Sequence, residues 1–286
     1  MAALTNWERS PKPREPGVHV FREIPLESLL PFADWNYFYF AWKVPAASEE
    51  ALRLKEEAEE MFRKIVRERA TEARAVIGFF PVQRNGDSLK VYAAEDSRKE
   101  LAELHFLRQQ ESAAGTFKSL ADYFNPHLED WIGLFAVSAG LGIGEFQKDL
   151  EARGDSYGAL LAKTLTDRLT EALSEKMHRD VMRSYWGYLP ENAEPFGIRP
   201  APGYPACPDS SELRTIWKLL SPEENIGIRL TENCMMLPLS STSGYYIAHP
   251  QSRYFSIGKI GEDQLRDYAA RKGISVEEVK KWLRIF

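Results

Sequence analysis

The sequence has few of the residues that build metal sites, disulfides and membrane spans. Its 286 residues include two cysteines, Cys207 and Cys234, which argues against a disulfide scaffold and fits a reducing compartment. The histidines form neither H-E-x-x-H nor a cysteine–histidine cluster with zinc spacing. Apolar runs such as residues 131–137 are far shorter than the ~20 residues of a membrane span. With no signal-type stretch at the N-terminus, we expect a soluble, cytoplasmic protein that has no membrane partner.

Common catalytic and nucleotide-binding motifs are also missing. The sequence contains neither G-x-x-x-x-G-K-[ST] nor G-x-S-x-G. A glycine-rich stretch at residues 138–144 follows an apolar run, but its spacing lacks the third glycine of the dinucleotide fingerprint, so a plain strand-to-helix turn is favoured over a phosphate cradle. With 37 basic and 42 acidic residues the formal net charge is −5, a poor balance for binding nucleic acid.

What is present indicates an ordinary globular chain. Apolar residues make up 44% and charged residues 28%, enough for a sizeable core. Residues 1–17 are rich in proline and charge and are expected to form an extended arm on the surface. No repeat, low-complexity tract or clean linker follows, so we expect one domain over residues 18–286. Helices and strands alternate without a βαβ rhythm, which predicts an α+β fold with a twisted antiparallel sheet and flanking helices.

Local patterns predict the main elements. Asn85-Gly86 between two β-rich runs predicts a hairpin over residues 74–92, and residues 131–137 resemble a buried strand. Ser48 is a good N-cap for a helix over 48–70, and leucines recur every four residues in a long helix over 155–185. Further helices are expected over 101–110, 211–220, 262–272 and 275–283, and further strands over 227–237, 244–248 and 253–257.

The most unusual segment is residues 197–208, which contains four prolines in nine residues. Such a segment forms neither a helix nor a central strand. It predicts a stiff loop whose carbonyls have few internal partners, in which Gly203 allows close approach to the backbone and Arg199 offers a planar fork for a carboxylate or phosphate. The alternative is a rigid connector with a surface arginine.

Other segments are compatible with both binding and purely structural roles. Asp34 lies in an aromatic stretch, residues 32–42, that must be largely buried or line a groove; it is either a cap or the anchor for an ammonium group. Glu171 follows Asp167 and precedes Glu175 by one helical turn each, a spacing that is usually a solvated face. The tyrosines of residues 243–255 are more often core than ligand platforms.

Several blocks resemble the C-terminal activation domain of cobalamin-dependent methionine synthase. They include IRPAPGYPACPD at residues 198–209 and TENCMMLP, then SGYYIAHPQSRYFSIGKIGEDQLRDYAARKG at residues 243–273. Earlier blocks are FADWNYFYFAW, AVIGFFPVQRNGDSLKVY, LHFLRQQ, SLADYF, IGLFAVSAGL and DRLTEALSEKMHRDVMRSYWGY. The resemblance covers nearly everything from about residue 18 to residue 283, with the blocks in the same order.

The resemblance implies a C-shaped α+β domain that binds S-adenosylmethionine (AdoMet) in a shallow groove rather than a Rossmann pocket. In this family the reactive cob(I)alamin is occasionally oxidised to cob(II)alamin. Flavodoxin or a flavoprotein reductase then supplies an electron and AdoMet a methyl group, so that methylcobalamin is regenerated. The chain would therefore be a component of methionine synthase, incomplete as an enzyme by itself, and would need no protein nucleophile because it positions a reactive donor.

Motif by motif, the resemblance carries ligand contacts over to this sequence. Arg199 would pair with the methionyl carboxylate and Asp34 with the ammonium group, while Glu171 would place negative charge near the sulfonium. Backbone groups of residues 201–204 would satisfy the adenine edge. The implied cofactor-binding residues are Asp34, Glu171, Arg199, Ala201, Gly203, Tyr204 and Tyr254, with no catalytic residue and no metal ligand.

The sequence departs from the family in three places. It has no D-x-H-x-x-G cobalamin signature, so we expect a cobalamin-binding module or a methionine synthase catalytic chain to act in trans, as in a split enzyme. Residues 188–197 form a shorter segment than is usual, and Ser210 stands where the family often has a histidine linked to docking. The alternatives are an AdoMet-dependent reactivator of another corrinoid methyltransferase, or a non-catalytic module that has lost the ligand.

Overall fold

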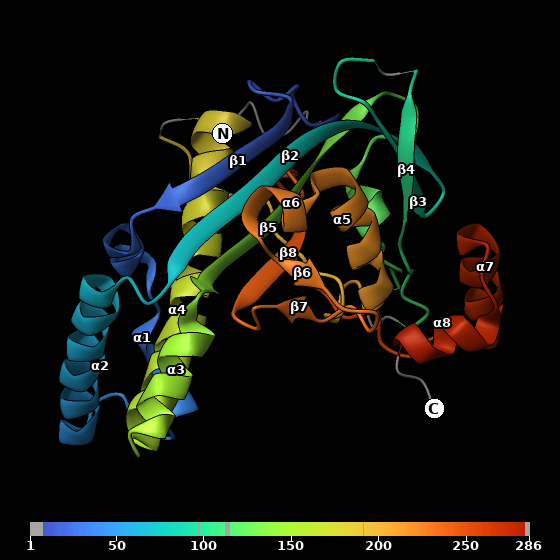
Figure 1. Ribbon diagram of the computed structural model, residues 1–286. Coiled ribbons are helices and arrows are strands. Elements are labelled where there is room, and N and C mark those ends of the chain that lie inside the picture. The colour runs from blue at the N-terminus through green and yellow to red at the C-terminus, as the bar shows by residue number, and fades with distance from the viewer. Residues whose placement is uncertain (1–7, 97, 112–114, 191, 284–286) are drawn as a thin grey trace.

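The computed structural model describes residues 8–96, 98–111, 115–190 and 192–283. A six-stranded antiparallel sheet forms its centre (Figure 1). Its order is β4-β3-β2-β5-β8, and β1 pairs with the same long strand β2 that pairs with β3. This arrangement confirms the predicted α+β class with an antiparallel sheet. The sheet strands are β1 Gly17–Ile24, β2 Glu72–Asn85, β3 Ser88–Tyr92, β4 Glu100–His105, β5 Asp130–Leu141 and β8 Ser241–Tyr246.

Helices cover both faces of the sheet and extend beyond it at its two ends (Figure 1). The long helix α4 lies on one face, and α5 and α6 lie on the other. At one end α2 and α3 run beside α4, and at the other α7 and α8 project from the sheet, so the outline is an arch. The helices are α1 Trp35–Ala41, α2 Glu49–Glu68, α3 Ile143–Ala152, α4 Ser156–Asp180, α5 Leu213–Leu220, α6 Pro222–Ile226, α7 Glu262–Lys272 and α8 Val276–Leu283.

Strand β5 is buried on both faces and therefore contributes to two cores. Alternate side chains of a strand point to opposite faces. Phe135 and Val137 face the core under α4, whereas Leu134 and Ala136 face the core under α5. This two-sided burial explains why its sequence is an unbroken apolar run, as predicted for residues 131–137.

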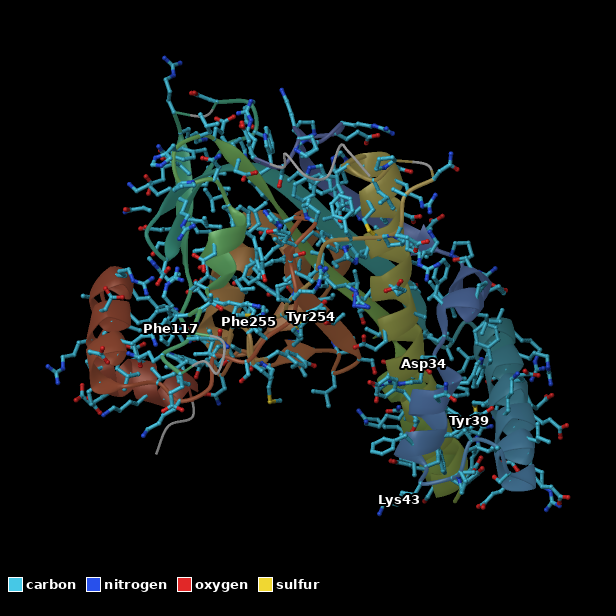
Figure 2. All side chains as sticks on the ribbon, turned by 180° about the vertical axis from the view of Figure 1, so that it is seen from behind. Asp34, Tyr39, Lys43, Phe117, Tyr254 and Phe255 are labelled. Carbon is cyan, nitrogen blue, oxygen red and sulfur yellow. The ribbon has the colours of Figure 1, made fainter. Side chains whose placement is uncertain are left out.

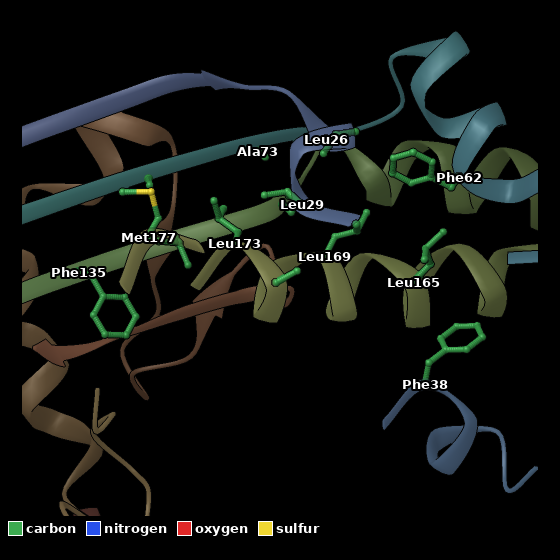
Figure 3. Close-up of a cluster of buried hydrophobic side chains, with 14 of the residues drawn as sticks. Leu26, Leu29, Phe38, Phe62, Ala73, Phe135, Leu165, Leu169, Leu173 and Met177 are labelled. Carbon is green, nitrogen blue, oxygen red and sulfur yellow. The ribbon is translucent and has the colours of Figure 1, made fainter. Parts of the chain in front are cut away.

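Helix α4 packs a stripe of apolar side chains into the core on its side of the sheet (Figure 3). Its N-cap Asp155 accepts a hydrogen bond from the amide of Gly158 at 2.7 Å. Each fully buried leucine contributes roughly 1.5–3 kcal/mol through the apolar surface removed from water. The helix predicted over 155–185 is therefore confirmed, although its last turn, Val181–Tyr185, is a π-helix. The buried stripe consists of Leu161, Leu165, Leu169, Leu173 and Met177.

Caps and turns follow the sequence signals. The Ser48 hydroxyl accepts a hydrogen bond from the amide of Ala51 at 3.1 Å and begins α2. Asn85 faces Ser88 across the predicted hairpin. Gly142 has a φ of +96° where β5 turns into α3, which confirms a plain strand-to-helix turn in the glycine-rich stretch. Gly273, at a φ of +67°, ends α7.

The helix predicted over residues 101–110 is wrong. Residues 100–105 form β4, in which His105 faces Ser88 of β3. The segment is rich in residues that favour helices, but β3 offers an unpaired edge. Pairing with that edge satisfies the backbone of β4, and tertiary context of this kind commonly outweighs helix propensity.

Two predicted strands also differ from the structure. Residues 227–237 form two short strands, β6 Arg229–Leu230 and β7 Met236–Leu237, because the chain reverses at Cys234, where φ is +58°. Residues 253–257 form no strand. The amide of Ile257 instead donates to the carbonyl of Pro205 at 2.8 Å, so this segment lies against the proline-rich loop rather than in the sheet.

Residues 8–16 of the predicted arm form neither helix nor strand and are tied to the end of the sheet; residues 1–7 lie outside the described residues. The amide of Ser10 donates to Asp130 at 2.9 Å, and its hydroxyl donates to the carbonyl of Ala248 at 3.1 Å. The carbonyl of Pro11 accepts from the indole of Trp186 at 2.8 Å. The division into an arm and one domain stays a prediction.

Among the described helices, none combines the length and apolarity needed to cross a membrane.

A buried ionic cluster attaches α7 to the segment that precedes α5. The Lys272 ammonium contacts Asp209 and Glu212 at 2.6 Å each, and the Tyr268 hydroxyl donates to Asp209 at 2.9 Å. Burial would raise the pKa of Asp209, but Lys272 lowers it below its usual value. Burial raises the pKa of Glu212, against the opposing effect of Lys272.

We predict that Lys272→Met destabilises the fold by about 3–5 kcal/mol, because removing one member of a buried ion cluster leaves the other charges uncompensated. Urea denaturation at neutral pH measures the loss. The control is Lys280→Met, which removes the exposed pair with Glu262 and should cost less than about 1 kcal/mol. Equal losses for the two variants would contradict the role of the cluster.

Candidate functional site

The proline-rich loop, residues 197–208, is held against strand β8 by backbone hydrogen bonds. The amide of Tyr245 donates to the carbonyl of Pro200 at 2.9 Å, and Ile198 exchanges two hydrogen bonds with Ile247, at 2.9 and 3.1 Å. The loop continues the edge of the sheet, although proline prevents it from becoming a strand. Arg199 and Ala201 are thereby fixed beside β8.

The loop also closes on itself at a few points, although most of its carbonyls have no partner within the loop among the described residues, as expected. The Ala201 carbonyl accepts from the amide of Tyr204 at 3.2 Å and from the thiol of Cys207 at 2.9 Å. The Gly203 amide donates to the carbonyl of Cys207 at 2.8 Å. Because the prolines prevent pairing in a regular strand, these turns supply hydrogen bonds to some of the loop's backbone groups. The hydrogen bonds stiffen the loop in addition to the prolines.

The close approach of the loop to β8 requires a glycine that the sequence reasoning did not single out. A Cβ atom at Gly244 would overlap the carbonyl oxygen of Pro200 and would lie 3.1 Å from the Cα of Ala201. A glycine inside a strand often marks the close approach of another backbone. The position of Gly244 in a predicted strand is therefore the sequence feature that indicates this contact.

An apolar pocket of about 240 Å³ lies between the loop, β8 and α4. Tyr254 and Phe255, which follow β8, also line this pocket, and Figure 2 labels both near the centre of the view. The pocket is suited to a flat, largely apolar group with a few polar atoms at its edge. It is lined by Phe135, Glu171, Ser174, Arg199, Pro200, Ala201, Tyr204, Pro205, Ala206, Thr242, Tyr254 and Phe255.

A larger, polar pocket of about 900 Å³ adjoins the apolar one. It lies between α4 and the segment that leads into α1, where Figure 2 places Asp34. Three residues, Glu171, Arg199 and Tyr204, line both pockets, so we describe the two as one groove with an apolar and a polar end. The polar end is lined by Pro31, Phe32, Ala33, Asp34, Trp35, Asn36, Tyr37, Arg168, Glu171, Glu175, Arg179, Arg199 and Tyr204.

The charges of the polar end balance within the described residues. Three arginines, Arg168, Arg179 and Arg199, face three acids, Asp34, Glu171 and Glu175. Such an arrangement is suited to a zwitterionic group, which presents a carboxylate and an ammonium together.

Asp34 is both a helix cap and a groove residue. One of its carboxylate oxygens accepts from the amides of Asn36 at 2.9 Å and Tyr37 at 3.4 Å, and so caps α1. The cap and anchor interpretations are therefore compatible. The aromatic stretch around it is only partly buried, since Phe38 and Tyr39 are buried but Tyr37 and Phe40 are 62% and 79% exposed.

Glu171 and Arg199 occupy the junction of the two ends. Arg199 donates through Nη2 to Glu175 at 3.2 Å, and its backbone amide donates to the hydroxyl of Tyr254 at 3.0 Å. Asp167 accepts a hydrogen bond from Ser240 at 2.5 Å. Asp167 and Glu175 pair with Lys163 and Arg179 on the same helix. Each also has a partner from a distant segment, so the interpretation as a merely solvated face is incomplete for these two acids.

The structure thus brings together Asp34, Glu171, Arg199, Ala201, Tyr204 and Tyr254 along one groove. Gly203 is not among the described lining residues of either end; with a φ of +91° it forms the turn behind Tyr204. Three further lining residues, Phe255, Arg168 and Arg179, were not predicted from the sequence.

Beneath Arg199, the ring of His178 is buried and stacks on Tyr246, with ring centroids 5.3 Å apart. Its Nε2 has no hydrogen-bond partner among the described residues. Burial, followed by the nearby charge of Arg199, lowers the pKa of His178 to about 4. The imidazole is therefore neutral at pH 7, and Arg199 has no second cation beneath it.

The side chains that line the groove are suited to recognition. The described lining residues include no nucleophile activated by a neighbouring base, and the described part of the chain holds no cluster of three or more potential metal ligands. Cys207 is buried, and burial raises the pKa of its thiol far above the usual value, so it is inert. The arrangement can bind and orient a molecule with a flat apolar part and a charged part.

Both the sequence and the fold are similar to those of known proteins. The sequence matches the family described as vitamin B12-dependent methionine synthase, activation domain, over residues 25–273. Among solved structures, the chain is similar to a crystal structure of the MetH reactivation domain bound to AdoHcy. The two share 38% sequence identity at a TM-score of 0.92, and the match covers 98% of this chain and 93% of the other.

The neutral state of His178 predicts a loss of stability in acid. The unfolded chain takes up the proton near pH 6.5, whereas the folded chain takes it up only near pH 4. The free energy of unfolding therefore falls as the pH drops through this interval, by about 3 kcal/mol from His178. In His178→Gln the decrease between pH 6.5 and 4 should be smaller by that amount. Urea titrations across this range measure it.

The exposed His127 provides the matched control, as His127→Gln, which should follow the wild-type curve. If His178→Gln also followed the wild-type curve, the neutral, buried state of His178 would be contradicted.

Proposed function

The chain belongs to the activation-domain family of vitamin B12-dependent methionine synthase, and on that premise we propose that its groove binds AdoMet and presents the methyl group to a cobalamin held by another protein module. One observation carries the proposal: an apolar pocket and a charge-balanced polar pocket meet at Glu171, Arg199 and Tyr204. AdoMet has the same division, with an adenosyl group at one end, a zwitterionic amino acid at the other and a sulfonium between them.

The adenosyl group fits the apolar end. Tyr204, Tyr254 and Phe255 offer aromatic surface for a flat ring. The Tyr204 and Gly203 amides are already bonded inside the loop. The adenine edge is therefore assigned to the Ala201 amide, for which the described residues provide no partner, with Gly203 acting through the shape of the turn.

The methionyl group fits the polar end. Arg199 binds the carboxylate through its planar guanidinium, and Asp34 receives the ammonium group. Glu171, which lines both ends, lies beside the sulfonium. Its negative charge favours the cationic AdoMet over the neutral thioether that remains after methyl transfer.

The protein contributes binding and orientation to the reaction. The methyl carbon leaves the sulfonium sulfur, which keeps the bonding electron pair and becomes the thioether of S-adenosylhomocysteine (AdoHcy). When bound by the partner module and reduced with an electron from flavodoxin or a flavoprotein reductase, cobalamin supplies the cobalt that accepts the methyl group. Holding the donor in the reactive position converts a bimolecular encounter into an oriented one, which is the main source of rate.

We further propose that the cobalamin module acts in trans, as in a split methionine synthase. The 286 residues lack the D-x-H-x-x-G signature, which supports a corrinoid held outside this sequence. Ser210, at the start of the short 3₁₀ turn Ser210–Glu212, supports one alternative partner, the corrinoid protein of another methyltransferase, because the family often has a histidine there.

Calorimetric titration should show AdoMet binding to the wild-type protein. Arg199→Ala should weaken it by about 10- to 100-fold, since hydrogen bonds to charged groups contribute roughly 1.5–3 kcal/mol. Arg229→Ala, which removes an exposed arginine away from the groove, is the control and should leave the affinity unchanged. Failure of the wild type to bind would contradict the proposed function. Full affinity in Arg199→Ala would contradict the carboxylate assignment.

Glu171→Gln should weaken AdoMet binding by roughly fivefold and leave AdoHcy binding within twofold of wild type, because one charge–charge interaction across a partly exposed site is worth on the order of 1 kcal/mol. Parallel titrations with the two ligands measure the ratio. An equal loss for both ligands would show that Glu171 does not sense the sulfonium charge.

The trans arrangement predicts methyl transfer when the protein, AdoMet and a reductant are mixed with a separate cobalamin module of methionine synthase. The change in the corrinoid absorption spectrum measures it. Transfer only to the corrinoid protein of another methyltransferase would favour the alternative partner. Tight AdoMet binding with no transfer to either module would indicate a binding module without this activity.

A further inference from the structure

The carboxylate of Glu175 lies between two arginines at the polar end of the groove. Its Oε1 accepts from the Nε of Arg179 at 2.9 Å, and its Oε2 accepts from the Nη2 of Arg199 at 3.2 Å. Burial alone would raise the pKa of Glu175, but the hydrogen bond from Arg179 and the charge of Arg199 lower it below its usual value. Glu175 is therefore ionised at neutral pH and able to hold both cations.

Arg199 depends on this contact. Within the described residues, Glu175 is the hydrogen-bond partner of its guanidinium, and its Nε is buried without a partner. A free arginine side chain populates many rotamers. A guanidinium that is not fixed would have to lose this freedom when a ligand carboxylate binds.

Glu175 itself is fixed independently of Arg199. It projects from the third-last turn of the long helix α4, and Arg179 holds its other oxygen from one turn further along. The guanidinium of Arg179 in turn stacks over the ring of Phe32, 5.2 Å from its centroid. The anchor of Arg199 therefore has its own partners before any ligand arrives.

We infer that Glu175 is a positioning residue for the ligand-carboxylate site, which acts by fixing the guanidinium of Arg199 between the apolar and polar ends of the groove. This inference rests on the proposed function for the identity of the ligand, but the contact that it invokes exists in the free protein. Glu175 thus differs from Glu171, whose proposed role is to sense the sulfonium charge directly.

A purely electrostatic role for Glu175 makes a different prediction. If its charge alone mattered, Glu175→Gln would weaken the binding of AdoMet, whose net charge is positive, and spare AdoHcy, which has no sulfonium. Positioning of Arg199 affects the carboxylate, which both ligands share. Both ligands should then lose affinity by the same factor.

The test is calorimetric titration of both ligands with Glu175→Gln and Glu175→Asp. The second variant keeps the charge but withdraws the carboxylate by one methylene. We expect each variant to weaken AdoMet and AdoHcy by about tenfold, as for loss of one charge-assisted hydrogen bond. The matched control is Asp180→Asn, which removes an acid from the same helix whose partner is Lys176; it should remain within twofold of wild type.

A double-mutant cycle tests whether the effect passes through Arg199. In the Arg199→Ala background, Glu175→Gln should change the affinity by less than twofold, because the contact that it removes is already lost. A tenfold loss in that background, or a loss confined to AdoMet, would overturn the positioning role.

A ligand-free measurement separates this inference from the proposed function. The Nε–H of Arg199 should give a slowly exchanging signal in the nitrogen–proton NMR spectrum, assigned by its absence from Arg199→Lys. The signal should broaden or vanish in Glu175→Gln and persist in Asp180→Asn. If it is unchanged in Glu175→Gln, the positioning role is wrong whatever the wild type binds. If it responds as expected but the wild type binds neither ligand, the proposed function fails and the positioning of Arg199 stands.

Discussion

The proline-rich loop, residues 197–208, approaches β8 so closely that a side chain cannot fit between them, and the rest of the site depends on this contact. The carbonyl of Pro200 accepts the amide of Tyr245 and lies where a Cβ of residue 244 would be. The backbone hydrogen bonds between the loop and the end of β8 therefore fix the positions of Arg199 and Ala201. The opposite wall is α4, whose position is set by the leucine stripe packed under the sheet. The groove is the space between these two fixed elements.

Such a groove suits a protein whose task is to hold a reactive molecule rather than to attack it. Its two ends differ in polarity, and the charges that line the polar end sum to zero, with Glu175 shared between Arg179 and Arg199. A set of charges that sums to zero can receive a zwitterionic ligand without leaving a net charge in the groove. The methyl donor supplies the chemistry, so the proposed function requires no nucleophile in the groove.

The sequence allows the fold class to be predicted from local signals and most of the candidate site from the motif resemblance. Period-four leucines indicate α4, an unbroken apolar run indicates β5, and the motif resemblance implies the residues that the structure gathers along the groove. What could not be predicted arises from contacts between distant segments. β4 is a strand because β3 leaves an edge beside it, although its composition favours a helix. Glu175 lies one helical turn from Glu171, a spacing typical of a solvent-exposed helix face. Its partner Arg199 lies 24 residues later in the sequence, in the proline-rich loop, and this contact cannot be predicted from local spacing.

A crystal structure of this protein grown with AdoMet would test the assignment of the groove. We expect a methionyl carboxylate within hydrogen-bond distance of Arg199, a sulfonium beside Glu171, and an adenine between the loop and Phe255. An AdoMet molecule bound elsewhere, or bound with its adenine at the polar end beside Asp34, would contradict the assignment of the groove.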